Sequence, residues 1–224
     1  MKVIYNVNDI KEELRTGDLI LFDSRSSYPI KILDWAVKFF TNSNYNHIAM
    51  ILKDPYFLAD VNPGSSKEMF EGLFVWESSW EGEPDPQDGK VKLGVQVTDL
   101  EQVLKSNGGT AYIRKLICPQ TLYDNTFTDN NLKKIHKIVY DKPYDVNPID
   151  WISALFRVNF TPKKENTFWC SALIGVIYNK LKIIKDNIDW TIMRPSDFSL
   201  EDKSKHIEFN DGFNLSDFQI QILC

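Results

Sequence analysis

The first half of the chain consists of short apolar runs separated by polar turns, a pattern that predicts a sheet of short strands. Residues 73–80 stand out because one acid, Glu77, interrupts their apolar character. A last apolar stretch, at 213–223, predicts an edge strand. The predicted strands cover residues 19–22, 47–52, 73–80, 91–97, 111–117 and 213–223.

Helical periodicity dominates the second half and is strongest at 168–183, where apolar residues form one stripe. Thr98, with Glu101 three residues later, matches the capping box that begins a helix. Thr128 or Asp129 could cap a later helix in the same way. The predicted helices cover residues 9–16, 29–40, 98–105, 128–140, 148–156 and 168–183.

Polar stretches with Pro, Gly or Asn predict loops, and the one at 81–90 is a candidate for a mobile flap. Because the strands precede most of the helices and no linker is evident, the sequence predicts a single α+β domain over residues 1–224. The predicted loops cover residues 24–28, 41–46, 54–71, 81–90 and 157–166.

Composition narrows the function classes. Net charge is −5, which argues against a nucleic-acid-coating role because such proteins need clustered positive charge. No apolar run reaches the roughly 18 residues of a membrane span, and the polar start lacks a signal core. The three cysteines, Cys118, Cys170 and Cys224, are far apart and show no disulfide or metal pattern. We therefore expect a reducing compartment such as the cytosol.

Cys170 is the first candidate for chemistry, because it lies at the predicted N-terminus of the strongest helix. Free backbone N–H groups and the positive dipole end of a helix favour the thiolate, which is the nucleophilic form. The same N–H groups could hold an oxyanion during acyl transfer. The alternative is a small buried cysteine that only fills the core.

His47 is the candidate base, since it stands at the start of an apolar strand and the chain has only two other histidines. His136 belongs to a Lys-rich helix and is expected on a solvated face. His206 lies in a charged stretch and is expected to be a poor base as well. Glu77 could orient His47, and the phenol of Tyr144 could donate to an oxyanion. Taken alone, Glu77 could also be an outward-facing strand residue and Tyr144 a turn aromatic.

Five motifs follow one another in chain order over residues 16–199: GDLILF (17–22), NHIAMI (46–51), VWE (75–77), PYD (143–145) with WCSAL (169–173), and RPSDF (194–198). Together they resemble the circularly permuted branch of the NlpC-type papain-like cysteine hydrolases. The His-before-Cys order is the permuted one, and similar groups include YiiX-like proteins, a poxvirus group and the lecithin retinol acyltransferase group.

The resemblance implies a permuted papain-like fold, an antiparallel sheet or small barrel packed against helices, with a C-terminal extension at about 200–224. It implies Cys170 as nucleophile, His47 as base, Glu77 as orienting acid and Tyr144 as oxyanion helper. No metal and no cofactor are expected. One departure is Ala172, where many YiiX-like members have an acid two residues after the nucleophile.

The implied activity is hydrolysis of an amide or ester carbonyl through a thioester, as in cysteine peptidases and amidases. Substrates would be peptide, cell-wall-type or lipid acyl compounds, with at most transient membrane contact. Trp169, Ser171 and Trp76 are the expected substrate-binding residues, although the tryptophans could equally be core. Alternatives are acyl transfer or lipid acyl hydrolysis on the same site, or a non-catalytic binding module. The compartment would be the cytoplasm, or a host cytoplasm or virion if the source is viral.

Overall fold

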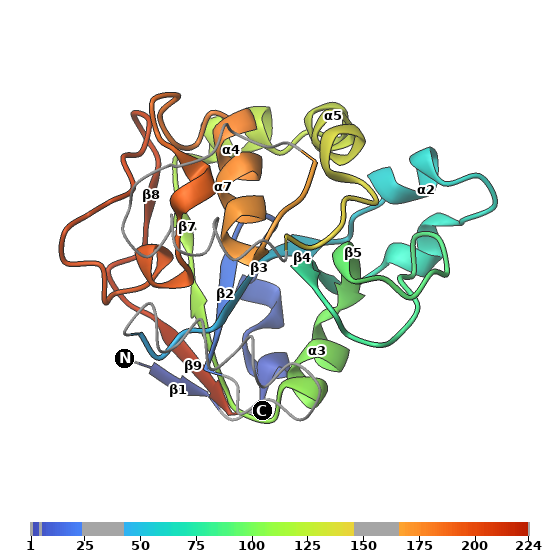
Figure 1. The fold of residues 1–224 in the computed structure, drawn as a ribbon, viewed down its shortest axis with the longest axis horizontal. Coiled ribbons are helices and arrows are strands. Elements are labelled where there is room, and N and C mark those ends of the chain that lie inside the picture. Colours follow the sequence, from blue (N-terminus) through green and yellow to red (C-terminus); the bar gives the residue numbers. More distant parts are fainter. Residues whose placement is uncertain (1, 5, 24–42, 146–165, 224) are drawn as a thin grey trace.

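A computed structural model describes residues 2–4, 6–23, 43–145 and 166–223 (Figure 1). Its main sheet contains β1 (Lys2–Ile4), β2 (Leu19–Asp23), β3 (His47–Lys53), β4 (Leu73–Ser79), β5 (Gly94–Asp99), β6 (Thr110–Arg114) and β9 (Ile220–Leu223). The strand order is β1-β9-β6-β2-β3-β4-β5. All neighbouring pairs are antiparallel except β1 and β9, which run parallel. A second sheet pairs β7 (Leu116–Ile117) with β8 (Asn214–Leu215).

The helices pack on both faces of the main sheet. They are α2 (Phe57–Val61), α3 (Leu100–Asn107), α4 (Gln120–Thr126), α5 (Asp129–Val139) and α7 (Cys170–Lys180). Short 3₁₀ turns occur at η1 (Val7–Asp9), η2 (Lys11–Glu13), η3 (Lys67–Phe70), η4 (Trp190–Ile192) and η5 (Pro195–Phe198). In the described residues, no helix combines the length and the apolar character needed to cross a membrane.

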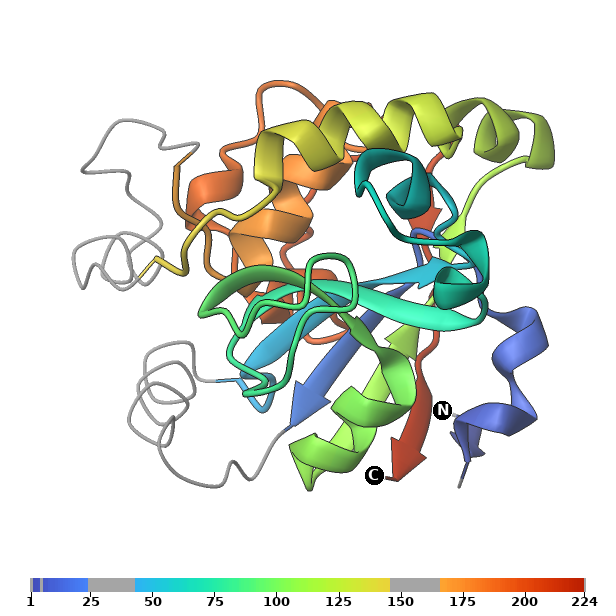
Figure 2. The same cartoon turned by 90° about the vertical axis from the view of Figure 1, so that its right-hand side faces the viewer.

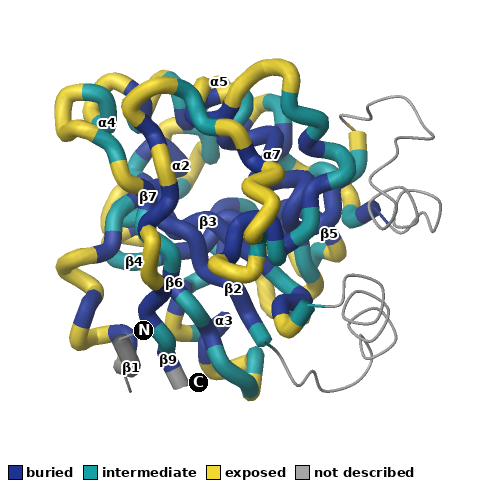
Figure 3. Tube along the Cα trace, turned by 90° about the vertical axis from the view of Figure 1, so that its left-hand side faces the viewer, coloured by how far each residue is buried: buried dark blue, intermediate teal, exposed yellow. Residues whose placement is uncertain are grey.

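Strand alternation divides the core into two parts. On β2, Leu19 and Leu21 face the larger core, which α2, α5 and α7 cover, whereas Ile20 and Phe22 face the smaller core under α3 and η1. Figure 2 shows α5 and α7 on one side of the sheet and α3 on the other. Because both faces are covered, β2 and β3 are buried almost throughout (Figure 3), which explains their continuous apolar sequence.

The α+β class, the mainly antiparallel sheet and the helix packing are confirmed. The strands predicted at 19–22, 47–52 and 73–80 are present as β2, β3 and β4. Of the two predicted caps of α5, Thr128 is the observed one, because its side chain accepts a hydrogen bond from the backbone N–H of Asn131. The predicted helices at 29–40 and 148–156 lie outside the described residues, as do the loop at 24–28 and most of 157–166.

Other boundaries were wrong, each where a local signal competed with tertiary packing. The helix expected at 9–16 is instead the two 3₁₀ turns η1 and η2, and the expected loop at 54–71 contains α2 and η3. Asp99 caps α3 in place of Thr98, by accepting from the N–H of Gln102 at 3.0 Å. Thr98 is occupied elsewhere, because its hydroxyl donates to Glu77.

Three predicted strands differ from the observed ones. The strand expected at 91–97 begins only at Gly94, and the one at 111–117 breaks into β6 and β7. The strand expected at the sheet edge, 213–223, splits into β8 and β9, and β9 lies inside the sheet between β1 and β6. The C-terminal part of the chain therefore completes the main sheet and is more than an appendage to it.

Candidate active site

Helix α7 begins at Cys170, two residues after the predicted start of the helix at 168, with Trp169 in extended backbone before it. The side chain of Trp169 makes no cap hydrogen bond, so it leaves the first-turn N–H groups of this described helix without that partner. Two hydroxyls fix the helix to the rest of the fold: Ser171 donates to the carbonyl of Met193 at 2.7 Å, and Tyr178 donates to the carbonyl of Gly17 at 2.6 Å. Cys170 is held at 5% exposure, close beneath the surface.

His47 is the first residue of β3 and lies opposite Phe22 of β2, against whose ring it packs at 5.5 Å between centroids. Its Nε2 lies 2.8 Å from Oε2 of Glu77. The thiol of Cys170 lies close enough to the ring of His47 to act on its charge. The structure therefore brings together three residues that are far apart in the sequence.

Glu77 on β4 is fully buried and accepts two hydrogen bonds, one from His47 and one from the Thr98 hydroxyl at 2.8 Å. Since a carboxylate only accepts, Nε2 of His47 carries the proton in this pair. That leaves Nδ1 as the ring nitrogen for Cys170. The order thiol, imidazole, carboxylate is that of a catalytic triad.

The electrostatics favour a charged imidazole. Burial by itself disfavours the imidazolium of His47, but the hydrogen bonds and charges of Cys170 and Glu77 outweigh this effect. Together they raise the pKa of His47 well above its usual value. A protonated His47 at neutral pH is the partner that a thiolate needs.

Tyr144 belongs to a segment that lies beside the start of α7. The N–H of Phe168 donates to the carbonyl of Pro143 at 3.1 Å, and the N–H of Asp145 donates to the carbonyl of Phe168 at 3.3 Å. Tyr144 is half-buried against the larger core, and its N–H donates to the carbonyl of Leu93. The backbone on either side of Tyr144 is thus hydrogen-bonded to Phe168, two residues before the candidate nucleophile. The role of the Tyr144 hydroxyl stays a prediction.

Two of the three expected substrate-binding residues are core residues. Trp76 is 1% exposed and packs against Phe57 and His136, while the hydroxyl of Ser171 is used inside the protein by Met193. Both side chains are used inside the protein, and their role in substrate binding stays a prediction. Trp169 is 7% exposed, and its buried indole N–H has no hydrogen-bond partner in the described structure.

The structure is similar to a known one. One match is the crystal structure of the metalloprotein YiiX from Escherichia coli O157:H7, with a TM-score of 0.46 and 16% sequence identity, covering 90% of this chain and 96% of that chain. No family model matches the chain, and no curated protein matches it. What the site can do follows from its own residues.

His136 is buried, so the prediction of a solvated face was wrong. Its Nε2 donates to Oε1 of Gln87 at 2.7 Å, and the amide of Gln87 donates to Asp85 at 2.6 Å. Burial, together with the positive charge of Lys92, lowers the pKa of His136 to about 4. A neutral, buried imidazole of this kind is structural.

Lys92 completes this cluster and fixes the loop that was expected to be a mobile flap. Its ammonium lies 2.8 Å from Asp85 and 2.9 Å from Asp88, and it is 8% exposed. Asp85 also accepts from the N–H of Val97 on β5. The middle of the 81–90 loop is therefore tied to the sheet and to α5 by buried polar contacts.

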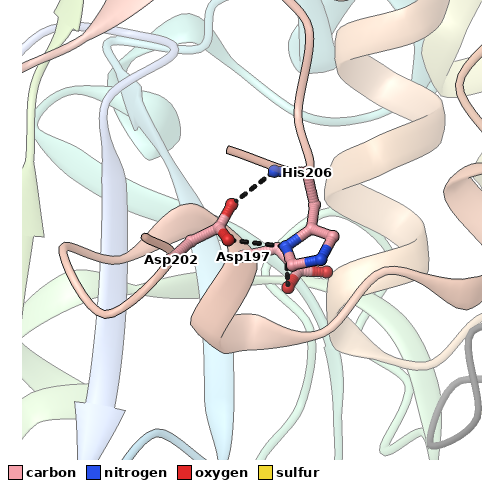
Figure 4. A group of neighbouring side chains, drawn as sticks. All are labelled: Asp197, Asp202 and His206. Carbon is pink, nitrogen blue, oxygen red and sulfur yellow. Dashed lines mark hydrogen bonds and ion pairs between the residues drawn. The ribbon is translucent and has the colours of Figure 1, made fainter. Parts of the chain in front are cut away.

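His206 lies in a separate group with Asp197 and Asp202 (Figure 4). Its Nδ1 donates to Asp202 at 2.5 Å and lies 3.9 Å from Asp197. The three ligand atoms lie within 4.8 Å of one another and could hold a metal ion. The carboxylate of Asp197 also accepts the N–H of Arg194 at the start of η5, so the hydrogen bonds of the group give it a structural role without an ion.

Glu81 is a residue that the sequence reasoning missed. Its carboxylate is half-buried and accepts hydrogen bonds from the hydroxyls of Ser79 and Ser106. Burial raises the pKa of Glu81 to about 7, and the negative charge of Glu77 adds to this effect. The signal in the sequence was alternation: Glu77, Ser79 and Glu81 are each two residues apart.

Proposed function

We propose that the chain is a cysteine hydrolase of the peptidase or amidase type, with Cys170 as nucleophile and His47 as its base. The observation that supports it best is the meeting of three residues: the thiol on the first residue of α7, Cys170, acts on His47, and His47 is hydrogen-bonded to the buried Glu77. The order of these residues along the chain also supports a permuted papain-like fold.

The reaction begins with a thiolate–imidazolium pair. The Cys170 thiolate attacks a substrate carbonyl carbon, and the oxyanion accepts hydrogen bonds from the N–H of Cys170 with Tyr144 as helper. The tetrahedral intermediate collapses to a thioester as His47 gives its proton to the leaving amine or alcohol. Water then attacks the thioester, His47 takes the proton from that water, and the acid leaves as the thiolate re-forms.

Acyl transfer uses the same site and differs only in the last nucleophile, so an amine or alcohol would replace water. The proposed substrates are amide or acyl-ester compounds. A reducing compartment is proposed as well, because the mechanism needs a free thiol; Cys118 and Cys170 are both unpaired among the described residues.

The test is the pH dependence of Cys170 alkylation by iodoacetamide, in a background lacking Cys118 and Cys224. An ordinary protein thiol, with a pKa of about 8.5, is about 3% ionised at pH 7. Full ionisation by His47 would therefore speed alkylation by up to about 30-fold. His47→Ala should lose this acceleration, and His206→Ala, a matched exposed histidine with a carboxylate partner, should keep it.

Turnover is tested by mass spectrometry with activated acyl esters and peptidyl amides. We expect an acyl adduct on Cys170 that decays by hydrolysis, and no adduct in Cys170→Ser. Product analysis with an added amine separates hydrolysis from transfer. Equal alkylation rates in wild type and His47→Ala, with no adduct from any substrate, would leave the binding-module alternative in place of an enzyme.

A further inference from the structure

A second acid, Glu81, lies near the His47–Glu77 pair and has no part in the mechanism above. Glu77 and Ser79 share one face of β4 because they are two residues apart. The Ser79 hydroxyl donates to Oε1 of Glu81 at 3.1 Å. Gln96, which lies opposite Glu77 in the β4–β5 register, donates to the same hydroxyl at 2.8 Å. These bonds hold the Glu81 carboxylate on the side of the strand that carries Glu77.

A cavity of about 440 Å³ opens beside Glu81, next to α3. From α3, the hydroxyl of Ser106 donates to Oε2 of Glu81 at 2.9 Å. Lys105 is the one base among the described residues that line the cavity, and it lies 3.6 Å from Glu101. The other lining residues are Glu83, Asp99 and Gln102. Solvent in this cavity can exchange a proton with Glu81.

The charge state of Glu81 is poised near neutral pH. Its pKa is raised to about 7 by burial and by the negative charge of Glu77, against the opposing charge of His47 and the two hydroxyls. The interaction is mutual, because a carboxylate that feels the charge of His47 also acts on that charge. Ionisation of Glu81 therefore makes the surroundings of the imidazole more negative.

We propose that Glu81 is a positioning residue of the site: as a carboxylate it stabilises the imidazolium of His47, and as a neutral acid it withdraws that support. The inference rests on the proposed function, because it assigns Glu81 a role in maintaining the thiolate–imidazolium pair. With Glu81 ionised, His47 keeps its proton to higher pH. The highest pH at which the thiolate–imidazolium pair persists then depends on a residue that touches neither the thiol nor the substrate.

The experiment is an NMR titration of the His47 ring in wild type, Glu81→Gln and Glu83→Gln. The chain has three histidines, so the His47 resonances are identified by their loss in His47→Ala. We expect an inflection near pH 7 in wild type and a deprotonation midpoint about half a pH unit lower in Glu81→Gln, which also lacks the inflection. Glu83 is the matched control, because it is exposed, lies two residues further along and lines the same cavity.

Glu81→Asp keeps the charge and should retain the inflection, which separates the electrostatic role from a packing role. Identical His47 curves in wild type and Glu81→Gln, or an equal shift in Glu83→Gln, would overturn the inference. The titration does not depend on turnover. If the alkylation test fails but Glu81→Gln shifts the His47 titration, the proposed function is wrong and the effect of Glu81 on His47 stands. If the alkylation test succeeds but the His47 titration is unchanged, only the role of Glu81 is rejected.

Discussion

The hydrogen bond between His47 and Glu77 gives the sharpest quantitative test of the site. Glu77→Gln removes the negative charge and keeps a side chain of nearly the same shape, so Oε1 of the amide can still accept from Nε2–H. A hydrogen bond to a charged group contributes about 1.5–3 kcal/mol and a neutral one about 0.5–1.5 kcal/mol. The difference, about 1–1.5 kcal/mol, corresponds to about one unit of pKa.

We therefore expect the pKa of His47 to fall by about one unit in Glu77→Gln, measured by NMR of the ring. Because the imidazolium is less stable relative to the neutral pair, alkylation of Cys170 at pH 7 should slow by up to about tenfold. Thr98→Val is the matched control: it removes the other hydrogen bond to Glu77 and keeps the charge, so its effect should be a few tenths of a unit. An unchanged His47 titration in Glu77→Gln would refute the assignment of Glu77.

Three further predictions concern the frame around the site. The folded-state pKa of His136, about 4, lies below the unfolded value of 6.5, so its contribution to stability is present above pH 6.5 and lost as pH falls towards 4. It amounts to at most about 3 kcal/mol, and His136→Gln should flatten this part of a stability-against-pH curve from urea unfolding. Lys92→Met should lower the free energy of unfolding by about 3 kcal/mol in the same assay, because it leaves the buried Asp85 carboxylate without its cation. The loss should be smaller in a chain that also carries Asp85→Asn. In Gly94→Ala, the added Cβ would lie 2.3 Å from the carbonyl oxygen of Lys142, so the melting temperature should fall. Lys142 precedes the 143–145 segment beside the start of α7, so alkylation of Cys170 should also slow. An unchanged alkylation rate would show that this contact does not position the site.

The elements that carry the site could be predicted because their local and tertiary signals agree. Strands β2, β3 and β4 are apolar on both faces of a covered sheet, and α7 is buried from Cys170 to Tyr178. In such elements apolar residues are required at nearly every position. The one charged residue within β4, Glu77, and the one histidine at the start of β3 therefore stood out.

The errors arise where a side chain had two possible partners. Thr98 fits a helix cap but donates to Glu77, and Asp99 takes the cap. The Lys-rich helix around His136 indicates a solvated face, yet Gln87 and Lys92 from a distant loop bury the histidine. Spacing along the chain does not show which loop packs against which helix, so these pairings needed the fold.

Glu81 shows how the same difficulty applies to the site itself. Its loop contains Pro and Gly and is correctly predicted as a loop, and a carboxylate in a loop is ordinarily solvated. Strand alternation nevertheless continues past the end of β4, so that Ser79 links Glu81 to the face of Glu77. A buried acid next to a second acid shifts towards its neutral form near physiological pH. Two carboxylates therefore act on His47 in the proposed triad. The apolar pattern of β4 identifies the first, Glu77, whereas the second, Glu81, is identified only once the packing of α3 against β4 is known.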